Sequence, residues 1–123
     1  MIRSEIEEYI CNQYGVLPEY PFEEDSLTAV FRHTDNKKWF AIVMRISKRR
    51  LNIDSDEEID VMNVKAEPVV IGSFLMEDGF YPAYHMNKTH WITIAPDAEE
   101  EKGKLLIDMS FSLTATKRKK AGK

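Results

Sequence analysis

The sequence predicts an α+β fold in which N- and C-terminal helices pack on one face of an antiparallel sheet. Apolar residues recur with helical spacing near both ends of the chain, whereas its middle alternates polar and apolar residues with the period of two typical of strands. Helices that flank a run of strands are typical of α+β proteins. With 123 residues, the chain is expected to form a single domain over residues 1–123.

The first predicted element is a helix that begins at Ser4. The segment Ser4-Glu5-Ile6-Glu7 matches a capping box, in which the Ser4 hydroxyl accepts from the N–H of Glu7 and the Glu7 carboxylate accepts from the N–H of Ser4. Gly15 predicts the end of this helix. Its apolar stripe comprises Ile6, Tyr9, Ile10 and Tyr14.

Three strands are predicted next. Residues 27–33 and 38–46 are rich in β-branched and aromatic residues, and the turn-forming residues 34–37 join them as a hairpin. A polar connection over 47–58 precedes a third strand at 59–67. Connections of about a dozen residues are usually functional or mobile.

The second half of the chain begins with Pro68, which suits the first position of a short buried helix over 69–76; a buried strand is the alternative for this apolar run. An aromatic loop over 80–89 and a short strand over 91–94 follow. Asp97 is expected to cap the last helix. The predicted stripe of that helix is Leu105, Leu106, Met109 and Leu113.

Alternation along the strands assigns residues to the two faces of the sheet. The face beneath the helices is expected to hold Phe31, Phe40, Ile42, Met44, Ile46, Met62, Val64, Ile92 and Ile94. The opposite face is expected to hold Val30, Arg32, Trp39, Val43, Arg45, Val61, Asn63, Lys65, Trp91 and Thr93. Such a surface suits stacking of nucleobases on tryptophan while cations bind phosphates. The alternative is that tryptophans and long basic side chains pack across strands and shield the sheet.

The net charge of −4 is unevenly distributed. Residues 102–123 contain seven basic residues and one acidic residue, a local charge of +6, whereas residues 1–101 carry −10. The run Lys117-Arg118-Lys119-Lys120 opens a basic tail over 117–123 that we expect to be frayed. Its cations either offset the dipole of the last helix or form an arm that contacts phosphates.

The densest cluster of chemically active side chains lies between Tyr84 and Trp91. A metal shared by His33, His85 and His90 would need a special loop geometry, and one cysteine excludes thiolate-rich sites. Acid–base chemistry at a histidine is an alternative to a structural role. The chain has neither a Gly-x-Ser-x-Gly elbow nor a glycine-rich phosphate loop. We therefore expect that the protein is not an enzyme and that it binds neither a metal nor a cofactor.

The same features predict a compartment. The single cysteine, Cys11, allows no internal disulfide, and no apolar run reaches the roughly 18 residues that a membrane span requires. The N-terminus turns acidic at once, which is unlike a secretion signal. We therefore expect a cytoplasmic monomer without a membrane partner.

Three segments resemble the MmcQ/YjbR family of small bacterial proteins. They are Asn63-Val64-Lys65-Ala66-Glu67-Pro68, the more specific Tyr84-His85-Met86-Asn87-Lys88-Thr89-His90-Trp91, and the last helix with Ser110-Phe111 and Leu113. The resemblance extends from the first helix to about Lys117. It implies a frataxin-like, or CyaY-like, fold of the double-wing type, which is described as a DNA-binding module in at least one member.

We therefore expect a non-enzymatic DNA-binding protein with weak and largely sequence-independent affinity. The expected nucleic-acid-binding residues are Arg32, Trp39, Arg45, Lys48, Arg49, Arg50, Lys65, Lys88, Trp91, Lys117, Arg118, Lys119 and Lys120. The expected motif loop contains Tyr84, His85, Met86, Asn87, Lys88, His90 and Trp91. The acidic segment 54–60 would repel phosphate from its edge of the sheet. The alternative is an adaptor domain that binds a protein or a small ligand on the tryptophan-bearing sheet face.

Overall fold

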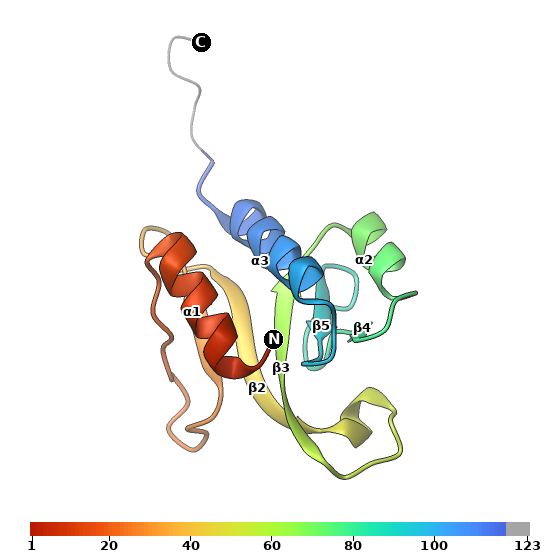
Figure 1. The fold of residues 1–123 in the computed structure, drawn as a ribbon. Coiled ribbons are helices and arrows are strands. Elements are labelled where there is room, and N and C mark those ends of the chain that lie inside the picture. The colour runs from red at the N-terminus through yellow and green to blue at the C-terminus, as the bar shows by residue number, and fades with distance from the viewer. Residues whose placement is uncertain (118–123) are drawn as a thin grey trace.

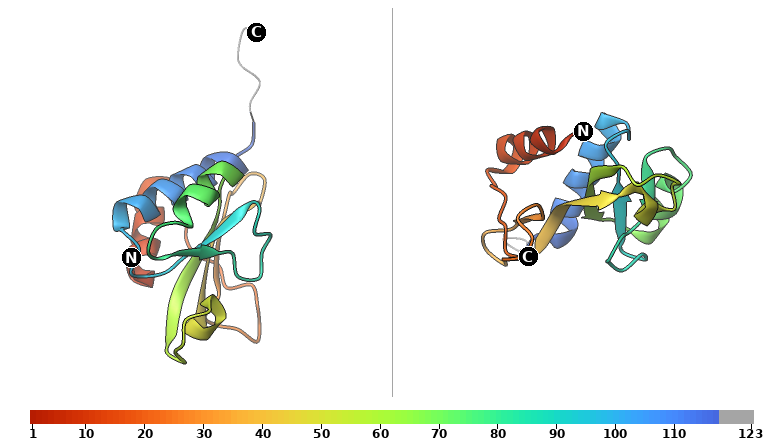
Figure 2. Two further views of the ribbon diagram at one scale, coloured as in Figure 1. Left: turned by 90° about the vertical axis from the view of Figure 1, so that its right-hand side faces the viewer. Right: turned by 90° about the horizontal axis from the view of Figure 1, so that it is seen from below.

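A five-stranded antiparallel sheet and three α-helices make up the computed structural model, which describes residues 1–117. The elements in chain order are α1 (Arg3–Tyr14), β1 (Ala29–Arg32), β2 (Trp39–Ser47), the 3₁₀ helix η1 (Lys48–Leu51), β3 (Glu58–Lys65), α2 (Pro68–Phe74), β4 (Phe80–Pro82), β5 (Trp91–Ile94) and α3 (Glu100–Thr114). The strand order is β1-β2-β3-β5-β4. The helices α1 and α3 lie on the same side of the sheet, which confirms the α+β prediction (Figures 1 and 2). None of the helices in the described residues is long and apolar enough to cross a membrane.

The main hydrophobic core lies between the sheet and the helices α1 and α3. From α1, Ile6 and Ile10 contribute, as the predicted stripe requires, and both are almost completely buried. On α3 the buried side chains are Leu106, Ile107, Ser110 and Thr114. The predicted stripe of α3 is thus wrong at Leu105 and Leu113, which are 54% and 38% exposed. Ser110 lies in the core because its hydroxyl donates to the carbonyl of Phe40 at 2.6 Å.

One carboxylate connects the two terminal helices. Asp108 on α3 accepts hydrogen bonds from the hydroxyl groups of Tyr9 and Tyr14 on α1, and the Tyr9 bond measures 2.8 Å. The Tyr14 ring stacks on Phe111 with centroids 3.8 Å apart. Charge-assisted hydrogen bonds are roughly twice as strong as neutral ones. The pair of tyrosines therefore fixes α1 against α3 above the sheet.

Both predicted N-caps are displaced. The first helix has Ile2 as its N-cap, and its N–H donates to the Glu5 carboxylate at 2.8 Å. The Ser4–Glu7 capping box is therefore wrong, because the acidic partner lies two residues earlier. In α3 the N-cap is Glu99 rather than Asp97, since residues 95–98 form a turn first.

A β-bulge in β2 overturns the predicted faces for half of that strand. Phe31 pairs with Ala41, but Arg32 pairs with Trp39, so Phe40 is an extra residue in β2. Phe40 and Ala41 both belong to the main core, and the alternation is reversed beyond them. Contrary to prediction, Ile42, Met44 and Ile46 therefore lie on the face away from the helices, which we call the open face, while Val43 and Arg45 lie on the helix side. The other face assignments agree with the structure.

The remaining differences concern short elements. The apolar run after Pro68 forms the helix α2, so the strand alternative is wrong. Within the predicted aromatic loop, Phe80–Pro82 forms β4, which pairs antiparallel with β5. At the two outer strands of the sheet, Pro82 ends β4, and Glu19 forms an isolated bridge with Val30 of β1.

We predict that the tyrosine pair makes stability depend on pH at alkaline values. Burial, and then the hydrogen bond and charge of Asp108, raise the pKa of Tyr9 from 10.0 to about 12 and also raise the pKa of Tyr14. The unfolded chain therefore loses these protons first, and the free energy of unfolding should be fully present below pH ~10 and fall between pH ~10 and ~12. Urea denaturation across this range measures the slope.

The variant Tyr9→Phe should show a smaller fall, because it removes one of the two raised groups. Tyr20→Phe, which removes an exposed hydroxyl without a bond to Asp108, is the matched control. Equal slopes for the unaltered chain and for Tyr9→Phe would contradict the assignment.

Candidate functional site

The predicted cationic residues are divided between the two ends of the sheet. At one end of the sheet, Ser47 pairs with Glu58; at the other, Lys65 pairs with Trp91. Trp39 begins β2 and therefore lies at the same end as Lys65 and Trp91, which we call the tryptophan end. The polar hairpin over residues 45–60 lies at the opposite end, which we call the hairpin end.

Ion pairs hold most of the predicted cations at the hairpin end. Lys48 pairs with Glu57, and this contact raises the pKa of Lys48 and lowers that of Glu57. Arg49 contacts Asp54 at 3.2 Å and Asp56 at 2.7 Å. The acidic segment that follows the basic run thus folds back onto it and compensates its charge.

Two further predicted cations are also paired. The guanidinium of Arg45 lies 3.6 Å from both Glu58 and Asp60. At the other side of the sheet, Arg32 makes a bidentate contact with Glu19 at 2.8 and 2.6 Å. Arg32 is thus the cross-strand partner of Trp39, as expected, but carboxylates already compensate its charge and those of the hairpin cations.

At the tryptophan end, lysine is the prevailing charged residue. Lys37 and Lys38 are exposed in the turn between β1 and β2, and Lys65 is half-buried at the end of β3. Among residues 1–117, no carboxylate lies within 4.0 Å of these three ammonium groups. Lys88 lies in the neighbouring loop, where its ammonium donates to the carbonyl of Ala83 at 2.9 Å.

The end of α3 joins this cluster. The Asn36 side chain in the β1–β2 turn donates to the carbonyl of Thr114 at 2.9 Å and to the Thr116 hydroxyl at 3.2 Å. The exposed Lys117 therefore follows directly on residues held at the tryptophan end. The other predicted tail residues, Arg118, Lys119 and Lys120, lie outside the described residues. Lys37 and Lys38 were missed, although Lys37 lies in the predicted turn and Lys38 directly follows it.

The motif loop folds over the open face of the sheet. The N–H of Tyr84 donates to the Thr93 hydroxyl at 2.9 Å, and the Asn63 side chain donates to the carbonyl of Tyr84 at 2.8 Å. The Thr93 hydroxyl donates in turn to the Asn63 side chain at 2.5 Å. Asn63 and Thr93 are completely buried, so the expectation that they face solvent is wrong. They hold the loop to the sheet.

The turn within this loop is built by Asn87. Its carbonyl accepts from the N–H groups of His90 and Trp91, and its side chain accepts from the N–H of Thr89 at 2.8 Å. A side-chain oxygen that bonds the backbone two residues later is an Asx-turn. Asn87 therefore has a structural role, and it orients Trp91 into the first position of β5.

The three histidines lie in different environments. His33 is buried on the helix side, where its Nε2 lies 2.9 Å from the Thr114 hydroxyl and its ring packs on Phe40 and Phe111. His85 is exposed on the opposite side of the sheet, and His90 is exposed in the Asn87 turn. Among residues 1–117, no three His, Cys, Asp or Glu side chains are grouped as a metal site requires.

A groove of about 570 Å³ crosses the open face of the sheet. Ile42 and Met44 of β2 lie on its floor, since the bulge turns them to this face. The groove is lined by Phe22, Asp25, Thr28, Trp39, Ile42, Met44, Arg45, Ile46, Tyr84, His85 and Met86. Of the predicted site residues, it thus brings together Trp39 and Arg45 with Tyr84, His85 and Met86, and adds Phe22, which the sequence did not single out.

Comparison with known proteins gives one family. The YjbR family model matches residues 12–113. The uncharacterized protein YyaQ of Bacillus subtilis is 35% identical over 116 residues, which cover 93% of this chain and 98% of YyaQ. A crystal structure of a Pseudomonas syringae protein is 39% identical with a TM-score of 0.90, covering 94% of this chain and all of that chain. A Deinococcus radiodurans protein, DR2400, shares the fold at 22% identity and a TM-score of 0.71, covering 98% of this chain and 83% of its own.

We predict that Thr93→Val destabilises the protein by about 1–3 kcal/mol, because the Tyr84 N–H and the Asn63 side chain each lose a buried partner. Amide hydrogen exchange at Tyr84 should accelerate as the loop opens. Thr93→Ser keeps the hydroxyl and is the matched control, with slow exchange retained. An unchanged exchange rate in Thr93→Val would show that these bonds do not hold the loop.

Proposed function

The chain belongs to the YjbR family, and we propose that it is a non-enzymatic DNA-binding protein whose contact surface is the tryptophan end of the sheet. The relative YyaQ carries no assigned activity in its name, so the proposal depends on the residues of this chain. The observation that carries it is the gathering of lysines at one end of an otherwise acidic molecule, where Lys37, Lys38 and Lys65 have no carboxylate within 4.0 Å among residues 1–117.

The distribution of charge supports an interaction with phosphates. The described part of the chain uses carboxylates to neutralise the cations of the hairpin end, for example in the Lys48–Glu57 and Arg49–Asp56 pairs. Lys37, Lys38 and Lys65 have no such partners within 4.0 Å among residues 1–117. A local positive potential attracts a polyanion even when the net charge is negative.

The sequence after α3 adds further basic residues to those at the tryptophan end. Lys117 is followed by Arg118, Lys119 and Lys120, so the chain segment that leaves α3 carries further positive charge. Each lysine or arginine that neutralises a phosphate releases a counterion, which gives affinity without reading the base sequence. Binding is therefore weak and largely independent of sequence.

The tryptophans give a second type of contact. Trp39 and Trp91 are half-buried, and each begins a strand at the lysine-bearing end. A nucleobase that stacks on an indole ring contributes about 1–3 kcal/mol with little dependence on base identity. This favours contact with unpaired bases at ends or openings of the duplex. The only cysteine, Cys11, is unpaired, which supports a reducing, cytoplasmic location, and we propose a monomer.

An alternative function uses the same sheet face. The groove over β2 is lined largely by apolar and aromatic side chains, as sites for small ligands are. This supports a ligand-binding domain as the second candidate.

We predict that the double variant Lys38→Gln/Lys65→Gln binds duplex DNA more weakly at low salt than the unaltered chain. The slope of log affinity against log salt should decrease in magnitude by about 1.8, since each phosphate contact contributes about 0.9. Fluorescence anisotropy with labelled duplex DNA, titrated over a roughly tenfold range of ionic strength, measures the affinity and its salt slope.

The control is Lys48→Gln/Arg49→Gln, which makes the same change in charge at the hairpin end. Because carboxylates already compensate these cations, affinity and slope should stay close to those of the unaltered chain. Absence of DNA binding at the lowest salt, or an equal loss in the control, would contradict the proposal.

A further inference from the structure

The groove over β2 combines a fixed apolar floor with aromatic walls. Ile42 and Ile46 are 4% and 7% exposed, so the floor is packed from beneath and offers only a thin apolar surface. On one side the wall is the segment that contains Phe22, and on the other it is the motif loop that contains Tyr84. The bonds of the Tyr84 backbone to Asn63 and Thr93 fix this second wall.

Aromatic rings line both sides of the groove. Phe22 packs edge-on against Trp39, with centroids 6.2 Å apart and an interplanar angle of 88°. Tyr84 packs against His85 with centroids 3.9 Å apart and rings tilted by 42°, and His85 has a positive φ of 60°, a conformation uncommon outside glycine and asparagine. Aromatic faces attract cations through the ring quadrupole, and tryptophan does so best.

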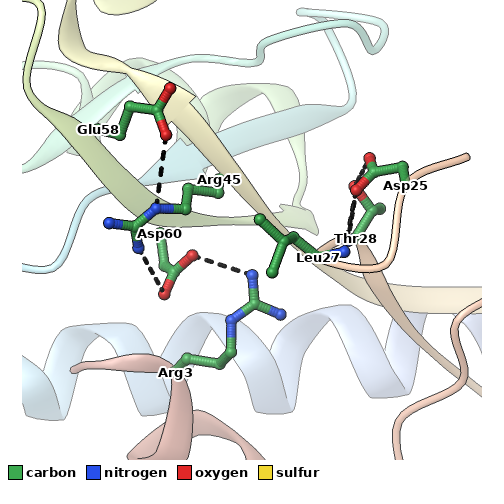
Figure 3. Close-up of polar contacts among 7 residues, drawn as sticks. All are labelled: Arg3, Asp25, Leu27, Thr28, Arg45, Glu58 and Asp60. Atoms are coloured by element: carbon green, nitrogen blue, oxygen red, sulfur yellow. Dashed lines mark hydrogen bonds and ion pairs between the residues drawn. The ribbon is translucent and has the colours of Figure 1, made fainter.

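A carboxylate completes the wall on the Phe22 side. Asp25 accepts from the N–H groups of Leu27 at 3.0 Å and Thr28 at 3.1 Å, and from the Thr28 hydroxyl (Figure 3). These bonds, with the Thr28 hydroxyl first, lower the pKa of Asp25, so it stays ionised. Glu23 and Glu24 precede it and are exposed. This side of the groove is therefore anionic.

Among residues 1–117, the one cation in the groove lining is Arg45, whose guanidinium is turned to the helix side and is already compensated there. Figure 3 shows the Arg45 guanidinium between Glu58 and Asp60, and Arg3 also belongs to this network because it contacts Asp60 at 2.9 Å. Two arginines and two carboxylates balance in charge. Among the described residues that line the groove, the charge that remains is that of Asp25.

We propose that this groove binds an organic monocation: a substituted ammonium ion with an apolar or aromatic body. The ammonium group pairs with the Asp25 carboxylate, and the apolar body lies on Ile42 and Met44 and extends toward the Trp39 ring. The inference identifies the ligand class of the second candidate function; it shares Trp39 with the proposed DNA contact but does not use the lysines on which that contact depends. It requires no change in backbone conformation, since the walls are fixed by hydrogen bonds in the structure described above.

The test compares three probes that share one aromatic body: 2-phenylethylammonium, 2-phenylethanol and phenylacetate. In the background Trp91→Phe, the fluorescence of Trp39 reports binding, because Trp39 is then the only tryptophan. The ammonium probe should bind about tenfold more tightly than the alcohol, and phenylacetate should bind most weakly.

Asp25→Asn in the same background isolates the charge, because the amide oxygen can still accept from the Leu27 and Thr28 backbone. This substitution should lower the affinity for the ammonium probe about fivefold and leave the affinity for the alcohol unchanged. The control Asp54→Asn removes an equal charge from a carboxylate that is 99% exposed at the hairpin end, and both probes should bind as before. Thermal unfolding of each variant verifies the fold.

Three results would overturn the proposal: equal affinity for all three probes, preference for phenylacetate, or no saturable change in Trp39 fluorescence with any probe. If Asp25→Asn does not fold, the comparison of the three probes on the Trp91→Phe chain still tests the proposal. Retention of the ammonium preference in Lys38→Gln/Lys65→Gln would show that this site is separate from the DNA contact, and its loss there would overturn the placement near Asp25.

Discussion

The extra residue in β2 is the constraint on which both faces of the sheet depend. Phe40 and Ala41 are consecutive, yet both belong to the core beneath the helices, so the alternation of the strand is reversed beyond them. Val43 consequently packs under the helices, and Ile42 and Met44 reach the other face. An antiparallel sheet of this kind ordinarily exposes one polar face to solvent, but here both faces carry apolar side chains.

The second apolar face is covered by segments that have little regular structure. Ile46, Leu51 and Val61 form a small cluster under η1 and the motif loop, and Tyr84 packs against it. The loop itself is held by a chain of polar groups, Asn63 and Thr93, that are completely buried but fully bonded. A satisfied polar network fixes geometry more specifically than apolar contacts do. The groove is the part of this face that the two covering segments leave uncovered.

The sequence predicted the features that depend on local rules. Helical periodicity and Gly15 located α1, Pro68 located α2, and the period of two located β2, β3 and β5. The bulge was not predictable, because the run from Trp39 to Val43 is uniformly apolar and contains no polar residue to mark a change of face. For the same reason the groove could not be predicted, because Ile42 and Met44 on its floor were expected to lie beneath the helices.

Long-range pairing explains the other misses. Asn63 and Thr93 look like exposed polar residues until the motif loop is placed above them. Likewise, the charges of Lys48 and Arg49 are compensated only when the hairpin brings residues 54–57 back beside them.

The outer strands of the sheet are both modified at their free edges. Glu19 bonds Val30 in both directions at 2.9 and 2.8 Å, and Pro82 ends β4 without an N–H to donate. Both edges thus resist the addition of a strand from another chain, so the apolar groove lies between sheet edges that are poor templates for intermolecular pairing.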